Sequence, residues 1–190
     1  NFAEGFSKDT YSNYILMGAT GLGKTHLSTS VAKTVIENGY DVKYVTALNM
    51  IGDFENKRFS NASDAETINK ISRYYYAELL IIDDFGTELS NQFTVSCLYD
   101  VINMRINNRR STIINTNLNH GEIEAKYGER IASRLLGEYL PVVFSGKFSG
   151  RVSFSRKKSG WVFRNFSTTP SFSLRTRVQV EYISTPPGRT

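Results

Sequence analysis

The sequence contains a single cysteine, Cys97, among its 190 residues. A lone cysteine excludes a disulfide within the chain, and its position in a periodic apolar stretch favours a buried small hydrophobe over a nucleophile. Every apolar run is far shorter than the roughly 18 residues that span a membrane, and the opening NFAEGFSKDT lacks the pattern of a secretion signal. These absences exclude a disulfide-stapled or membrane-spanning class, and we expect a cytoplasmic location.

Acidic charge is scarce at one end of the sequence. The whole chain has a net charge of +5, a value that favours a nucleic-acid partner when it is spread evenly. The segment 147–190 holds nine Lys and Arg against one acid, a net +8, which leaves −3 for residues 1–146. The sequence therefore divides into a mildly acidic domain of ordinary globular composition, 1–146, and a basic tail, 147–190, rich in Ser, Arg and aromatic residues.

Short apolar runs alternate with stretches of helical periodicity and show no internal repeat. The runs that predict strands are Tyr14–Met17, Val42–Thr46, Leu79–Ile82, Thr112–Thr116 and Leu140–Phe144. Between them, apolar spacing predicts helices, including one over 48–57, one opened by a capping box of Ser63 and Glu66, and a long one that ends near Asn107. This order indicates an α/β fold: a three-layer sandwich with a five-stranded parallel sheet, whose ligand lies at the carboxyl ends of the strands.

The clearest motif is GATGLGKT, which follows the first predicted strand and opens a helix. The spacing G-x-x-x-x-G-K-T supplies backbone N–H groups for phosphate, a lysine for the β and γ phosphates, and a hydroxyl for Mg²⁺. The N-terminus of the helix also favours an anion. The motif therefore predicts binding of ATP with Mg²⁺. The predicted nucleotide-binding residues are Gly18, Ala19, Thr20, Gly21, Leu22, Gly23, Lys24, Thr25 and His26.

Polar residues also follow the third and fourth predicted strands. Asp83 comes directly after the buried run LLII, and we expect it to hold Mg²⁺ together with Thr25, while Asp84 orients the attacking water. Asn117 lies just past the fourth strand. Its amide either bridges the γ-phosphate and the water, or serves as a turn or helix cap. The combination predicts ATP hydrolysis.

Two groups of arginines have two interpretations each. Arg130 and Arg134 are four residues apart and share a helix face, where they either serve a neighbouring subunit or form a solvated basic face. Arg105, Arg109 and Arg110 cluster near a predicted helix end, where cations meet the helix dipole favourably. For this second group, a structural or general electrostatic role is favoured over a DNA track.

Taken in order, GATGLGKT, LLIIDDFGTE, IINTNL and GERIASRL resemble the AAA+ ATPases of the DnaC/DnaI helicase-loader group, which includes IstB-like transposition helpers. The resemblance covers about residues 11–145. It implies that Asn117 is the sensor 1 residue and that Arg134 is an arginine finger acting on ATP held by the adjacent subunit. It also implies ATP-dependent self-association, binding of single-stranded DNA, and delivery of a replicative helicase through a separate N-terminal domain.

The sequence departs from the family pattern at two places. Asp84 stands where many AAA+ proteins have glutamate, which implies slow hydrolysis. Beyond residue 147 no lid helix or sensor 2 arginine is recognisable, and the tail is either a basic DNA-contacting extension or a foreign end without an evolved role. The favoured function is an ATP-switched helicase loader. The alternatives are a transposase helper, a small-molecule kinase with the same phosphate loop, and a module that binds ATP without turnover.

Overall fold

The computed structural model describes residues 2–7, 9, 11–59 and 65–145 in full, and the backbone of 151–157, 160–166 and 179–182. The elements are, in chain order, β1 (Tyr14–Met17), α1 (Lys24–Glu37), β2 (Val42–Thr46), α2 (Ala47–Phe59), α3 (Ala65–Tyr76), β3 (Leu79–Phe85), α4 (Gln92–Asn107), β4 (Ser111–Thr116), α5 (His120–Tyr127), α6 (Glu129–Glu138), β5 (Leu140–Ser145), β6 (Arg151–Lys157), β7 (Gly160–Phe166) and β8 (Gln179–Tyr182). None of the helices in these ranges is long and apolar enough to cross a bilayer.

The main sheet has the strand order β2-β3-β4-β1-β5-β8. The first five strands are parallel, which confirms the predicted five-stranded sheet, and β8 from the tail pairs antiparallel with β5. The strands β6 and β7 form a separate antiparallel pair. Because β1 lies between β4 and β5, and β3 is next to β4, the loops that follow β1, β3 and β4 meet at one edge of the sheet.

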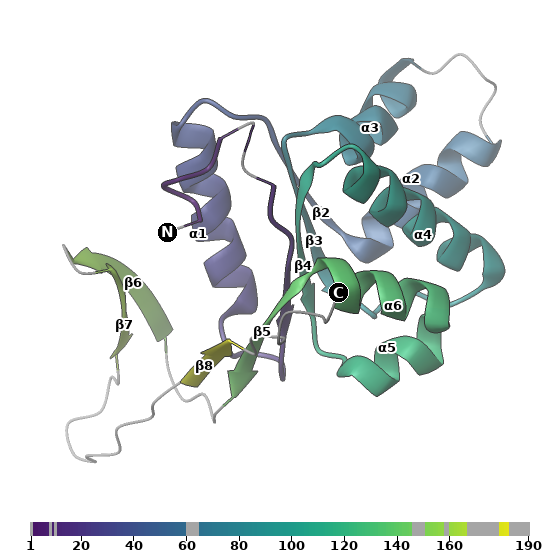
Figure 1. The fold of residues 1–190 in the computed structure, drawn as a ribbon. Helices are drawn as coiled ribbons and strands as arrows, with labels where there is room; N and C mark the ends of the chain where they lie inside the picture. Colours follow the sequence, from purple (N-terminus) through teal and green to yellow (C-terminus); the bar gives the residue numbers. More distant parts are fainter. Residues whose placement is uncertain are drawn as a thin grey trace, which may run out of the picture.

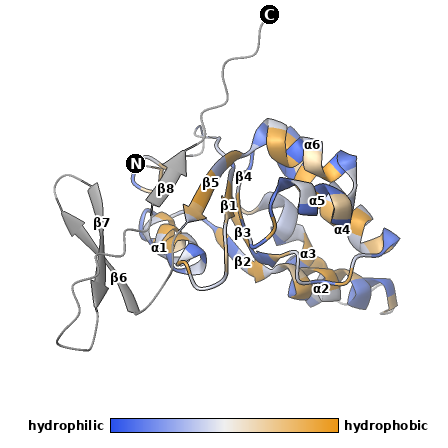
Figure 2. Cartoon of the chain, turned by 90° about the horizontal axis from the view of Figure 1, so that it is seen from below, coloured by the Kyte–Doolittle hydropathy of each residue, from blue (hydrophilic) through white to orange (hydrophobic). Residues whose placement is uncertain are grey.

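Helices cover both faces of this sheet, with α1 on one face and α2 to α6 on the other (Figure 1). The strand β3 shows why its apolar run is continuous: Leu79 and Ile81 pack into the core on the α1 side, and Leu80 and Ile82 into the core on the other side. Figure 2 shows hydrophobic residues in the central strands, and both hydrophobic and hydrophilic residues on the helices. The result is the predicted three-layer sandwich.

Several predicted boundaries differ in detail from the structure. The strand β3 continues to Phe85, three residues beyond the predicted end, through an irregularity in its pairing with β4. The helix α3 begins at Ala65 with Glu66 in its first turn, whereas the predicted cap Ser63 lies outside the described residues. Cys97 on α4 is half-buried rather than buried, and burial raises the pKa of its thiol to about 11. A protonated thiol fits the predicted packing role.

Arg105 is a structural residue, as the favoured interpretation expected. Its side chain is 0% exposed, and burial lowers its pKa to about 10. Its guanidinium donates hydrogen bonds of 2.6–3.2 Å to the Thr112 hydroxyl and to the carbonyls of Tyr74, Tyr75, Ala77 and Ser111. These bonds fasten the end of α3 to the start of β4, so a DNA track through Arg105 is excluded.

Candidate nucleotide-binding site

The phosphate loop joins β1 to α1 and is built by glycines in unusual conformations. Gly18 has a φ of +145°, and a Cβ at this position would lie 2.3 Å from the carbonyl oxygen of Phe144 on β5. Gly23 is the N-cap of α1 with a φ of 95°, and glycine offers no side chain to cover the first amides of the helix. Exposed amides at a helix N-terminus are suited to bind an anion. The loop thus needs glycine at both ends.

The other predicted loop residues divide between the core and the surface. Leu22 is 5% exposed and packs in the core on the α1 side, so it anchors the loop. Ala19, Thr20 and Gly21 form the exposed tip of the loop, and His26 is exposed on the first turn of α1. The structure therefore leaves the tip accessible while its base is fixed.

Lys24 points back into the loop that precedes it. Its ammonium donates hydrogen bonds to the carbonyls of Gly18 (2.5 Å) and Ala19 (2.9 Å) and to Oδ1 of Asn117 (2.8 Å). Burial lowers the pKa of Lys24, and the nearby carboxylates of Asp83 and Asp84 act in the opposite direction. The ammonium is therefore held at the point where the loop, β3 and β4 meet.

Asp83 forms the second part of the site. It is 4% exposed, and its Oδ1 accepts hydrogen bonds from the Thr25 hydroxyl (3.3 Å), the Asn115 amide (2.9 Å) and the backbone N–H of Asp84 (3.0 Å). A carboxylate beside a hydroxyl is a hard oxygen donor set, and Mg²⁺ is commonly bound by one or two carboxylates with waters and phosphates. In the fully described ranges, no cluster of three or more His, Cys, Asp or Glu forms a rival metal cage. The pair Thr25 and Asp83 therefore fits Mg²⁺.

Two residues at Asp83 were missed by sequence reasoning. Tyr44 on β2 donates its phenol hydrogen to Oδ2 of Asp83, and burial with this hydrogen bond raises the pKa of Tyr44, so the phenol stays a donor. Asn115, buried in β4, donates to Asp83 and also to the Ser28 hydroxyl at 2.7 Å. The only sequence signal for Asn115 is an amide in an apolar strand. Tyr44 carries no sequence signal of its role, because that role depends on the pairing of β2 with β3.

Asp84 is exposed at the edge of the sheet, immediately after the buried Asp83. Its φ is +52°, a conformation that residues other than glycine seldom adopt, and it lies within the irregular pairing of β3 with β4. Its carbonyl accepts hydrogen bonds from the backbone N–H and the hydroxyl of Thr87. Uncommon backbone conformations of this kind concentrate at functional sites.

Asn117 is brought to the phosphate loop by its hydrogen bond with Lys24. The helix cap in this segment is Asn119 instead, which accepts from the N–H of Glu122 and completes a capping box at the start of α5. Of the two interpretations of Asn117, the structure thus assigns the helix cap to a different residue. The sensor role of Asn117 stays a prediction.

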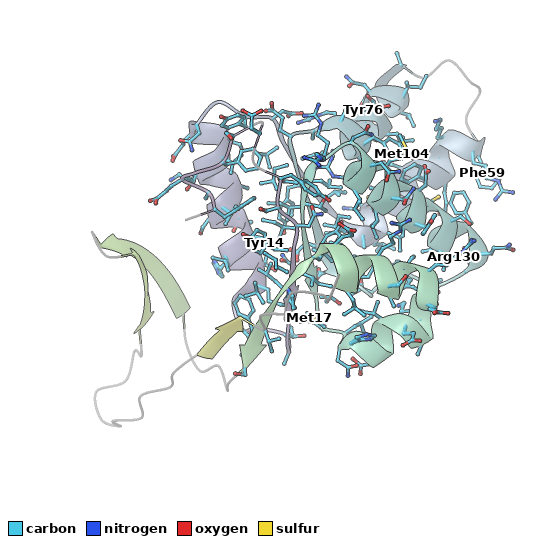
Figure 3. All side chains as sticks on the ribbon, in the orientation of Figure 1. Tyr14, Met17, Phe59, Tyr76, Met104 and Arg130 are labelled. Carbon is cyan, nitrogen blue, oxygen red and sulfur yellow. The ribbon has the colours of Figure 1, made fainter. Side chains whose placement is uncertain are left out.

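Arg130 and Arg134 lie on α6, away from the phosphate loop of their own chain. The guanidinium of Arg130 lies 5.9 Å from the ring centre of Tyr99 on α4, and Figure 3 shows Arg130 among the helices on the face opposite α1. Both arginines line a shallow pocket of about 300 Å³ with Tyr99, Ser133, Gly137 and Glu138. None of these residues belongs to the loop, so the structure does not gather Arg134 with Lys24 in one chain.

The fold and the site together define a P-loop protein of the AAA+ class. A family model described as IstB-like ATP binding protein matches residues 6–140. The chain belongs to this family of ATP-binding proteins.

The chain is also similar to curated proteins named as helicase loaders. The chain is 26% identical over 147 residues to the replicative helicase loader DnaC of Buchnera aphidicola subsp. Baizongia pistaciae, a match over 76% of this chain and 58% of the relative. For DnaC of Escherichia coli K12, identity is 26% over 136 residues, covering 70% of this chain and 54% of the relative. The matched region is thus little more than half of each relative.

Solved structures share the fold. A crystal structure of the DnaC helicase loader superposes with a TM-score of 0.65 at 22% identity, covering 75% of this chain and 83% of that one. The replication initiator DnaA, solved with AMPPCP and single-stranded DNA, gives a TM-score of 0.62 at 22% identity, covering 75% of this chain and 42% of that one. These likenesses concern the fold alone, over three quarters of the chain.

Proposed function

We propose that residues 1–146 form the ATPase unit of a replicative helicase loader, with the basic tail as an appendage. The observation that carries the ATPase part is the convergence of four predicted residues at one edge of the sheet: Lys24 bonded to Asn117, and Thr25 bonded to Asp83. The loader part is supported by the names of the DnaC relatives. A role on the replicating chromosome would put the protein in the cytoplasm.

In this proposal, the loop amides and Lys24 bind the phosphates of ATP. The carbonyl and amide oxygens that now accept from Lys24 are replaced by oxygens of the β and γ phosphates. Thr25 and Asp83 would hold Mg²⁺, which would offset the negative charge of the phosphates during hydrolysis. Nucleotide binding thus breaks the bond between Lys24 and Asn117 and frees the amide to face the γ-phosphate.

Hydrolysis needs a carboxylate that orients the attacking water. Asp84 is exposed beside the metal ligand, whereas Glu88 is 2% exposed and accepts hydrogen bonds from the Tyr127 hydroxyl and the Gly86 N–H. We therefore propose that Asp84 orients the attacking water. The reach of an aspartate is one methylene shorter than that of a glutamate, so turnover is slow.

Arg134 completes the site from a neighbouring subunit. Its position on α6, outside the loop of its own chain, suits a residue that acts in trans in an ATP-dependent oligomer. Single-stranded DNA is proposed as a further partner, with support from the DnaA structure, which is itself bound to single-stranded DNA. ATP would then link assembly on DNA to release of the helicase.

The alternative is an IstB-like transposase helper, which would share every residue of this site. Binding to purified partners separates the two functions. The chain, with and without ATP, is mixed with the replicative helicase and with an IS21-type transposase of the source cell, and each mixture is analysed by size-exclusion chromatography. Co-elution with the helicase supports a loader. Co-elution with the transposase alone supports a transposase helper instead of a loader. In a separate ATPase assay with DNA present, no measurable turnover would contradict the proposed ATP hydrolysis.

A further inference from the structure

The carboxylate of Asp83 receives a hydrogen bond that neither the phosphate loop nor the ATPase motifs account for. The donor is the phenol of Tyr44, which lies on β2, the neighbour of β3. In the β2–β3 register, Thr46 is opposite Asp83 and Tyr44 is opposite Ile81, so the phenol reaches along the sheet toward its carboxyl edge. A strand with no other part in the nucleotide site thus contacts the metal-binding carboxylate directly.

The two oxygens of Asp83 have different surroundings. Oδ2 accepts from Tyr44, while Oδ1 faces Thr25, Asn115 and the backbone N–H of Asp84. All four donors are neutral, so they fix the orientation of the carboxylate and leave its negative charge available to a cation. Partners of this kind orient metal ligands, and their loss typically lowers metal affinity about 10–100-fold.

We propose that Tyr44 is a positioning residue for the divalent metal, holding Oδ2 of Asp83 so that Oδ1 is presented beside the Thr25 hydroxyl. This inference rests on the proposed Mg-ATP site. It extends that site to β2, which carries none of the nucleotide-binding motifs. Tyr44 is 37% exposed and lines a cleft of about 730 Å³ beside α2, so its hydroxyl can be removed without opening a cavity in the core.

The test compares Tyr44→Phe with the wild-type protein and with Tyr76→Phe, a matched control at the exposed end of α3 (Figure 3). Binding of a fluorescent ATP analogue is titrated in EDTA and then at increasing Mg²⁺, and the melting temperature of each variant is recorded. For Tyr44→Phe we expect an apparent Mg²⁺ affinity about 10–100-fold weaker, with unchanged nucleotide affinity in EDTA. Tyr76→Phe should match the wild type in both.

Three results overturn the inference. An unchanged or tighter Mg²⁺ affinity in Tyr44→Phe shows that the phenol does not position Asp83. An equal loss of nucleotide affinity in EDTA and in Mg²⁺ shows that Tyr44 is only a tie between β2 and β3. Failure of the wild type itself to bind the analogue in Mg²⁺ overturns the nucleotide site and the inference together, and is distinguished from the first two by the wild-type titration.

Discussion

Replacing Gly18 by alanine perturbs the start of the phosphate loop without touching a charged group. The φ of +145° costs an L-residue about 1–3 kcal/mol. The added Cβ would lie 2.3 Å from the carbonyl oxygen and 3.0 Å from the Cβ of Phe144, and such overpacking costs about 1–3 kcal/mol more. We therefore expect Gly18→Ala to lower the free energy of unfolding by about 2–6 kcal/mol.

Gly39→Ala is the matched control, because Gly39 also has a positive φ, +88°, but a Cβ there would meet no atom within 4 Å. Its expected cost is the conformational part alone, about 1–3 kcal/mol. Urea denaturation gives both unfolding free energies. ATP titration should show weaker binding only for Gly18→Ala, because only there does the added Cβ push the phosphate loop away from β5. Equal destabilisation by the two variants, with equal ATP affinity, would refute the close packing of the loop against β5.

Two further predictions concern hydrolysis. Asp84→Asn should bind Mg-ATP as the wild type does and lose turnover, because Asp83 still holds the metal while the water loses its orienting carboxylate; wild-type turnover would remove Asp84 from the mechanism. Arg134→Ala should bind ATP normally but lose DNA-stimulated hydrolysis, by at most the 10³–10⁵-fold of the strongest arginine fingers. Mixing Arg134→Ala with Lys24→Ala should restore part of the activity. If mixed oligomers form and the mixture is still inactive, Arg134 does not act in trans.

The parts of the fold that local patterns determine could be predicted from the sequence. Buried parallel strands read as continuous apolar runs, so β1 to β5 were found with ends wrong by three residues at most, the largest error being at β3. The phosphate loop was found because its glycines and Lys24 are adjacent in sequence. The error at β3 arises because Asp83 and Asp84 break the apolar pattern although the backbone remains in the strand through Phe85.

Contacts between strands distant in sequence could not be predicted. Tyr44 and Asn115 reach Asp83 from β2 and β4, and only the strand order places these three residues together. The sequence does not decide between the sensor and cap roles of Asn117, because Asn suits both. The capping box at Asn119 is recognised only when the start of α5 is known. A periodic pattern gives the face of a helix or strand, but not its neighbour.

Whether ATP stabilises the chain through Lys24 is the most direct test of the nucleotide-binding site. At a hundredfold excess over its Kd, ATP adds about 2.7 kcal/mol of stability, or roughly 5–11 °C in melting temperature for a chain of this size. Lys33→Ala on the exposed side of the same helix is the control, since Lys33 contacts only Glu37 among the ion pairs of the described residues. Lys33→Ala should keep the full ATP-induced shift, and Lys24→Ala should lose it. A full shift in Lys24→Ala would contradict the nucleotide site.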